Sequence, residues 1–275
     1  MKKPELAVWT SYYVELSPED AVLELKKHGI HAAELSDEHG EMLLNRGDPI
    51  AVGTEFKAFL EKENFTMTQG HLWLKIRLCS DPDAYEKLCP WLDLYHAIGI
   101  RNGVLHVDRL HAEPDLTAEQ RMERNVEILR KIDAYLGDRE FRVCLENIGG
   151  FASTVEGLNA MIDRTGDRHF GICLDTGHLN LAADKDQERF IKAAGSRLRA
   201  LHIADNEGET DQHMMPFGKG KIRFDKVVSA LREIGYEELF NLEIPGEAHA
   251  PMEIKLAKLR YVKEICEYIT GRTGL

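Results

Sequence analysis

Short apolar runs alternate with longer amphipathic segments along most of the 275-residue chain. The runs are almost continuously apolar, which is typical of strands in a parallel sheet that is buried on both faces. The longer segments repeat their apolar residues at helical spacing. The pattern predicts strands at residues 6–10, 32–36, 66–71, 103–107, 142–147, 170–175, 199–204 and 239–244. It predicts helices at residues 18–28, 55–63, 82–98, 118–136, 155–164, 186–194, 224–234 and 251–269.

Strict alternation of strands and helices predicts an α/β fold with a parallel sheet. Eight such units are the number that closes a (β/α)8 barrel, and a barrel of this length is ordinarily a single domain. An open dinucleotide-binding sheet is disfavoured, because no Gly-x-Gly-x-x-Gly motif follows the first strand. We therefore expect one barrel over residues 1–275, with its functional site at the C-terminal ends of the strands.

Composition narrows the class of partner and the compartment. The formal net charge of −12 argues against nucleic acid as a partner, since a polyanion would be repelled. The five cysteines follow no pairing or metal-binding pattern. No signal peptide is evident and no apolar run approaches 18 residues, so we expect a cytoplasmic protein that does not enter a membrane. The sequence leaves the oligomeric state open, including a homo-oligomer.

Carboxylates and one imidazole stand at the ends of four predicted strands. Glu146, Asp175, His202 and Glu243 each close a short apolar run. The ends of parallel barrel strands meet at one face, where ionised groups would repel one another without a compensating cation. Carboxylate oxygens with one imidazole suit a divalent ion such as Mn²⁺, Mg²⁺, Co²⁺ or Zn²⁺. We expect one such ion on these four residues, although any single acid could instead be structural.

Further polar side chains follow the predicted strands. His178 comes three residues after Asp175, and Gly177 between them would permit a tight turn that directs both at one pocket. The longest irregular stretch, residues 205–223, is expected to cover the same face as a lid. The remaining candidates for binding substrate or further metal ions are His71, His106, Glu34, Asp211 and His213. Each of them could instead be a hydrogen-bonded rim residue or part of a bland connection.

These motifs resemble one known superfamily, the xylose-isomerase-like TIM barrels. The resemblance covers the order of strands along the chain. Its specific part is Leu-Glu146-Asn, Leu-Asp175-Thr-Gly-His178, His202-Ile-Ala-Asp, Asp211-Gln-His213 and Leu-Glu243. The superfamily contains sugar isomerases, ketose epimerases, inositol catabolism enzymes and abasic-site nucleases of the endonuclease IV type.

The resemblance to the ketose epimerases implies specific roles. It implies that Glu146, Asp175, His202 and Glu243 hold one divalent ion, and that Glu146 and Glu243 also act as the acid/base pair. It implies that His178 contacts substrate oxygens. The epimerases carry an arginine six residues after the metal histidine, where this chain has Gly208. The nuclease branch has further metal ligands at the positions of His71, His106, Asp211 and His213.

The resulting hypothesis is a metal-dependent sugar isomerase or epimerase. One glutamate would remove the proton next to a carbonyl to give an enediolate, and the other would return it. The same chemistry would allow a keto-sugar or keto-inositol dehydratase. A zinc-dependent abasic-site endonuclease and a non-catalytic sugar-binding barrel subunit are two further hypotheses that the residues allow. The sequence does not identify the sugar, its phosphorylation state or the metal.

Overall fold

A computed structural model describes residues 4–107, 115–246 and 249–273, and it confirms the predicted (β/α)8 TIM barrel. Eight strands pair in parallel, each with its neighbour in the chain, and the last strand returns to the first. A parallel bridge between Ile203 and Leu242 joins the two remaining edges. The strands are β1 Leu6–Trp9, β2 Ala32–Leu35, β3 Thr66–His71, β4 Asn102–His106, β5 Arg142–Glu146, β6 Phe170–Asp175, β7 Leu198–His202 and β8 Phe240–Leu242.

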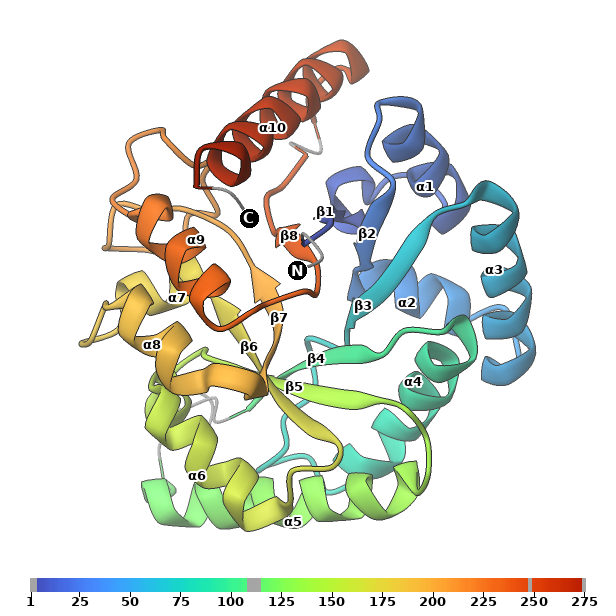
Figure 1. The fold of residues 1–275 in the computed structure, drawn as a ribbon. Coiled ribbons are helices and arrows are strands. Elements are labelled where there is room, and N and C mark those ends of the chain that lie inside the picture. The colour runs from blue at the N-terminus through green and yellow to red at the C-terminus, as the bar shows by residue number, and fades with distance from the viewer. Residues whose placement is uncertain (1–3, 108–114, 247–248, 274–275) are drawn as a thin grey trace.

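Helices surround the ring of strands, and Figure 1 shows them following one another around the barrel in chain order. The α-helices are α1 Pro18–Lys27, α2 Asp37–Leu44, α3 Pro49–Glu63, α4 Ala84–Ile98, α5 Ala118–Leu136, α6 Val155–Thr165, α7 Thr176–Leu181, α8 Gln187–Ala194, α9 Phe224–Glu233 and α10 Met252–Thr273. The short 3₁₀ turns among the described residues are η1 Thr10–Tyr13, η3 Gly150–Ser153 and η4 Gly195–Arg197. No helix within the described part of the chain is long and apolar enough to cross a membrane.

Helix starts account for most differences from the predicted elements. Helix α3 begins at residue 49 rather than 55, because Asp48 accepts a hydrogen bond from the backbone of Ala51 and Pro49 suits the first turn. Two helices were not predicted, α2 and α7, and their N-caps are Ser36 and Asp175. Both helices are short and begin within two residues of the end of a strand. No loop separates strand from helix in the sequence, so the helical spacing could not be recognised.

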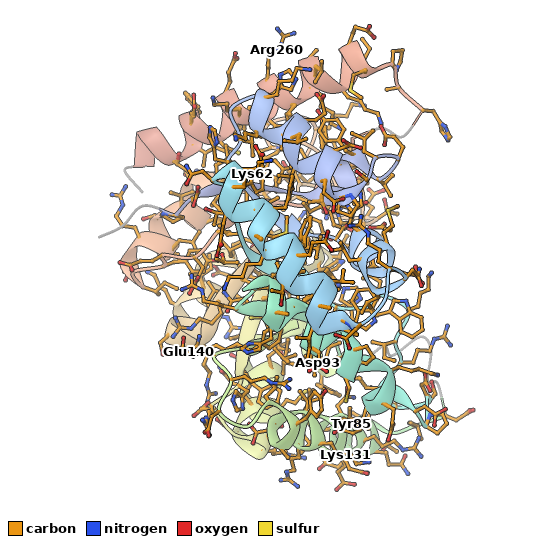
Figure 2. All side chains as sticks on the ribbon, turned by 90° about the vertical axis from the view of Figure 1, so that its right-hand side faces the viewer. Lys62, Tyr85, Asp93, Lys131, Glu140 and Arg260 are labelled. Atoms are coloured by element: carbon orange, nitrogen blue, oxygen red, sulfur yellow. The ribbon has the colours of Figure 1, made fainter. Side chains whose placement is uncertain are left out.

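A layer of small apolar side chains inside the barrel lies directly below the polar residues at the strand ends. Side chains two residues apart on a strand face the same side. Cys144 therefore lies on the same face of β5 as Glu146, and Cys173 on the same face of β6 as Asp175. The small buried residues Val104, Cys144, Cys173 and Ala200 form one cluster beneath the strand ends. The polar strand ends thus rest on a tightly packed apolar layer, while residues such as Lys62, Lys131 and Arg260 lie on the outer surface (Figure 2).

Helices α3 and α4 approach closely at Gly53, which provides a test of the outer packing. A Cβ atom there would lie 2.7 Å from both Ala97 Cβ and the Leu94 carbonyl oxygen. We expect Gly53→Ala to lower the free energy of unfolding by about 1–3 kcal/mol, the usual cost of overpacking, measured by urea denaturation.

Gly271→Ala is the matched control, since a Cβ there meets nothing within 4 Å and alanine favours a helix. The control should be neutral or slightly stabilising. Equal stability of the two variants would contradict the close packing of α3 on α4.

Candidate metal centre

Four side chains converge at the C-terminal mouth of the barrel. Glu146, Asp175, His202 and Glu243 each offer one ligand atom, and these atoms all lie within 4.8 Å of one another. The register explains the meeting, because Glu146 pairs with Cys173 and Asp175 pairs with His202 across β5, β6 and β7. Glu243 directly follows β8, whose last residues bond to Ile203 just past His202. The structure therefore brings together the four residues that the strand ends suggested.

Asp175 is held in place by its backbone and by Asn147. Asn147 accepts a hydrogen bond from the Asp175 N–H (2.7 Å) and donates one to the Asp175 carbonyl oxygen (3.0 Å). One carboxylate oxygen of Asp175 caps α7 by accepting from the backbone N–H of His178 (2.6 Å). The other oxygen, Oδ2, is buried without a hydrogen-bond partner. This second oxygen is the one available to a metal ion.

Glu146 lies among four imidazoles. Its two carboxylate oxygens are contacted by His106 Nε2 (2.9 Å), His178 Nδ1 (3.0 Å), His71 Nε2 (3.4 Å) and His202 Nδ1 (3.4 Å). Burial alone would raise the pKa of Glu146, but His106 and His202 hold it well below its usual range. The pKa shift favours the ionised form of Glu146, whose oxygens face four of the rings around the site.

Glu243 is compensated in the same way, because burial would raise its pKa but His202 lowers it to about 2. Asp175 is not compensated in this way. Burial raises the pKa of Asp175 to about 7, with further repulsion from Glu243 and Glu146. Several buried atoms of the site lack a hydrogen bond to any described residue: both oxygens of Glu146, Asp175 Oδ2, His202 Nδ1, Glu243 Oε2, His71 Nε2 and His178 Nδ1. Unpaired buried polar atoms are costly. Three carboxylates and an imidazole within 4.8 Å are a donor set that fits one divalent ion.

The rim of the site is formed by His178, Asp211 and His213. One oxygen of Asp211 contacts both His178 Nε2 (3.2 Å) and His213 Nε2 (3.1 Å). Burial would lower the pKa of His213, but its hydrogen bond to Asp211 raises that pKa to about 10. The exposed fraction of these side chains is 13% for His178, 25% for His213 and 37% for Asp211, whereas Glu146 and His202 are enclosed. The rim residues are therefore the ones that a soluble ligand meets first.

One expectation about local geometry was wrong, and a second residue lies elsewhere than at the rim. Gly177 makes no turn, because it lies inside α7. A glycine is needed there for steric reasons, since a Cβ atom would lie 3.1 Å from Asn206 and 3.2 Å from Asp175. Glu34 does not line the mouth. Its side chain is fully buried and contacts Nε2 of His202, on the side of that ring away from Glu146 and Glu243. The expected contact of Glu34 with substrate stays a prediction.

The segment 205–223 lies over this face and is folded rather than loose. Asp205 and Met214 form an antiparallel bridge, and the Asp205 carboxylate accepts from the backbone of Asn206 and Ile222. His213 reaches the site and is hydrogen-bonded to the carbonyl oxygen of Glu243 (2.8 Å). Within this segment the positive φ angles belong to Gly208, His213 and Phe217. Ordering of this lid by a sugar stays a prediction.

Sequence reasoning missed two asparagines that organise the site. Asn147 brackets the backbone of Asp175, and Asn241 donates a hydrogen bond to the carboxylate of Glu34. Asn241 could have been found from the period of two, because it lies two residues before Glu243 and shares its inward face. Asn147 gave no comparable pattern, since its importance comes from a contact across 28 residues of sequence.

Comparison with known proteins agrees with this architecture. The chain matches the model of the xylose isomerase-like TIM barrel family over residues 22–265. It therefore belongs to that family.

Individual relatives are more distant. The chain is 25% identical over 234 residues to the uncharacterized protein y4fM of Sinorhizobium fredii, a match that covers 83% of this chain and 70% of that protein. It is 28% identical over 200 residues to D-psicose 3-epimerase of Enterocloster bolteae, over 66% of this chain and 63% of the epimerase. The crystal structure of D-psicose 3-epimerase with D-tagatose from Clostridium cellulolyticum H10 has a TM-score of 0.78 at 18% identity, covering 96% and 99% of the two chains. The structural likeness shows a shared fold.

The anchoring of the 205–223 segment depends on Gly220. A Cβ at this position would lie 2.0 Å from the carboxylate carbon of Asp205, so the backbone must move. We expect Gly220→Ala to raise the rate of tryptic cleavage at Lys219 and Lys221 about tenfold, the factor produced by a loss of about 1.4 kcal/mol in local closing free energy. The measurement is limited proteolysis with mass spectrometry.

Gly218→Ala is the control, because its Cβ would have ordinary contact with the Met215 carbonyl oxygen at 3.4 Å. Its cleavage rate should match that of the native chain. Identical rates for both variants would show that the Asp205 carboxylate does not fix the segment.

Proposed function

We propose that this protein is a divalent-metal-dependent isomerase or epimerase of a small sugar. The observation that carries the proposal is the enclosed cluster of Glu146, Asp175, His202 and Glu243 at the mouth of the barrel. Membership of the xylose isomerase-like family and the similarity to a D-psicose 3-epimerase support the same class of reaction. The buried donor set supports the metal, and the family supports the substrate class.

A divalent ion bound there supplies Lewis-acid stabilisation of the negative charge that develops on sugar oxygens when the adjacent carbon loses its proton. Glu146, Asp175, His202 and Glu243 would hold that ion. The rim histidines His178 and His213 would orient the sugar by donating hydrogen bonds to its hydroxyl groups. The segment 205–223 would exclude water from the reacting carbon.

Glu243 is the better placed of the two glutamates to move the proton. Its side chain is 7% exposed and contacts His202 (3.2 Å) and, more distantly, His213 (3.9 Å). Glu146 is 1% exposed and has imidazoles against both oxygens. We propose that Glu243 removes the proton next to the carbonyl. Glu146, from a different strand, would return it at the opposite face or at the neighbouring carbon.

The proposal also covers the type of sugar and the cellular compartment. The arginine of the ketose epimerases is replaced by Gly208, whose φ of 81° favours glycine, so the sugar need not be one of their ketoses. We propose an unphosphorylated ketose or aldose. All five cysteines are free thiols, which supports a reducing compartment such as the cytoplasm.

A second candidate function is a zinc-dependent abasic-site endonuclease. The observation that favours it is a second group of possible ligands, His71, Glu146 and His202, which shares two residues with the first. His106 contacts Glu146, and Asp211 contacts both His178 and His213 at the rim, so the site has donors for more than one ion. The net charge of −12 opposes binding to DNA. Two or three zinc ions per chain, with cleavage of abasic DNA, would select the endonuclease.

Replacement of Glu243 by glutamine tests the proposed chemistry. The amide still offers an oxygen to a metal ion but cannot accept a proton. We expect Glu243→Gln to reduce deuterium incorporation from heavy water into the sugar, at the carbon beside its carbonyl, by about 10²–10⁴-fold. The measurement is proton NMR of a panel of unphosphorylated ketoses and aldoses with the Mn²⁺- or Co²⁺-loaded protein.

Metal content is determined for each sample, because loss of metal would imitate loss of the base. Glu237→Gln, at an exposed position next to the start of β8, is the matched control and should exchange at the native rate. A Glu243→Gln protein that retains its metal and more than a tenth of native exchange would exclude Glu243 as the base. Sugar binding without exchange by the native protein would favour a non-catalytic sugar-binding subunit.

A further inference from the structure

Glu34 on β2 is a fully buried acid that the proposed reaction does not use. Its side chain has no exposed surface. Both of its carboxylate oxygens lie 3.0 Å from His202 Nε2, which is the side of the ring that faces away from Glu146 and Glu243. Its ion pairs within the described ranges involve His202 and no lysine or arginine. A buried carboxylate is costly, so its partners define what it can do there.

Asn241 and His202 are hydrogen-bond partners of the Glu34 carboxyl group, and they fix its orientation. The side-chain amide nitrogen of Asn241 donates to Glu34 Oε2. A histidine that binds a metal through one nitrogen donates the N–H of the other to a carboxylate or carbonyl, and both oxygens of Glu34 lie within hydrogen-bond distance of Nε2. His202 Nε2 therefore bears the proton, and a neutral ring then leaves its lone pair on Nδ1.

The other edge of the ring points into the metal centre. His202 Nδ1 lies 3.2 Å from Glu243 Oε2 and 3.4 Å from Glu146 Oε1, and it has no hydrogen bond to any described residue. A metal ion binds the nitrogen that has the lone pair. The tautomer imposed by Glu34 is therefore the one in which the inward nitrogen can be a ligand.

We propose that Glu34 is a positioning residue, which acts through His202 by fixing the tautomer and orientation of the ring that serves as the nitrogen ligand. Asn241 holds Glu34 in turn, so the order of contacts is Asn241 to Glu34, Glu34 to His202, and His202 to the metal. The proposal rests on the metal site of the proposed function. In this proposal Glu34 increases the affinity for the metal and does not contact the sugar.

The first test measures the affinity of the intact protein for Zn²⁺ and Co²⁺ by competition with a chromophoric chelator. Glutamine keeps the size of Glu34 but removes its charge. We expect Glu34→Gln to weaken binding about 10–100-fold, the usual effect of losing a carboxylate behind a ligating histidine. The visible absorption spectrum of bound Co²⁺ should also change, because the orientation of the nitrogen ligand changes.

Asp133→Asn is the matched control. Asp133 makes an equivalent carboxylate–histidine contact with His169 Nδ1 (2.7 Å), but it lies on helix α5, outside the ring of strands. Its metal affinity should equal that of the native protein. Binding by Glu34→Gln within about twofold of native, or an equal loss in Asp133→Asn, would overturn the role of Glu34.

A second measurement needs no variant at Glu34 and so does not depend on that variant folding. Nitrogen-15 NMR of the native protein labelled at histidine and loaded with Zn²⁺ reports which ring nitrogen of His202 bears the proton and which binds the metal. The His202 signal is assigned by its loss in His202→Gln. A proton on Nε2 with the metal on Nδ1 supports the proposal, and a proton on Nδ1 with the metal on Nε2 overturns it.

The outcomes separate this inference from the proposed function. If the native protein binds neither Zn²⁺ nor Co²⁺, the metal-dependent function fails and the positioning role fails with it. If the native protein binds metal and Glu34→Gln binds it equally well, only the role of Glu34 fails.

Discussion

Electrostatic repulsion among the carboxylates of Glu146, Asp175 and Glu243 is the constraint around which the mouth of the barrel is built. These groups converge in a volume from which water is largely excluded, where their mutual repulsion is strong. Histidines relieve part of it, since His106, His178 and His202 all contact Glu146. Asp175 keeps an oxygen with no hydrogen bond and a pKa raised to about 7. A divalent cation would satisfy the atoms that the histidines do not reach.

The barrel supplies the rigidity that such a cluster requires. Small residues such as Cys144 and Cys173 fill the level beneath the acids and leave no room for the side chains to retract. The side chain of Asn147 is hydrogen-bonded to both the N–H and the carbonyl oxygen of Asp175. The end of β6 and the start of α7 therefore cannot shift without breaking two hydrogen bonds. Above the cluster, the bridge between Asp205 and Met214 fixes the segment that carries Asp211 and His213. Geometry suited to a metal ion thus comes from packing that is independent of the ion.

Much of this arrangement could be predicted because a parallel barrel converts sequence position into spatial position. The apolar runs that end in Glu146, Asp175 and Glu243 identified strand ends, and strand ends meet at one face. The contacts that each side chain makes around the barrel depend on register, which the pattern does not contain. Glu34 also ends an apolar run, yet its side chain is fully buried and contacts Nε2 of His202, on the side of that ring away from Glu146 and Glu243. Asn147 was overlooked for a related reason, since its partner Asp175 is distant in sequence.

The most direct test of a metal centre at this position is X-ray diffraction at the absorption edge of the bound metal, together with elemental analysis of the same crystals. Protein purified without chelators and supplied with Mn²⁺, Co²⁺ or Zn²⁺ should show an anomalous peak bonded to Glu146, Asp175, His202 and Glu243 at about 2.0–2.6 Å. The account would be contradicted by crystals in which those four side chains keep their positions and no anomalous peak lies between them.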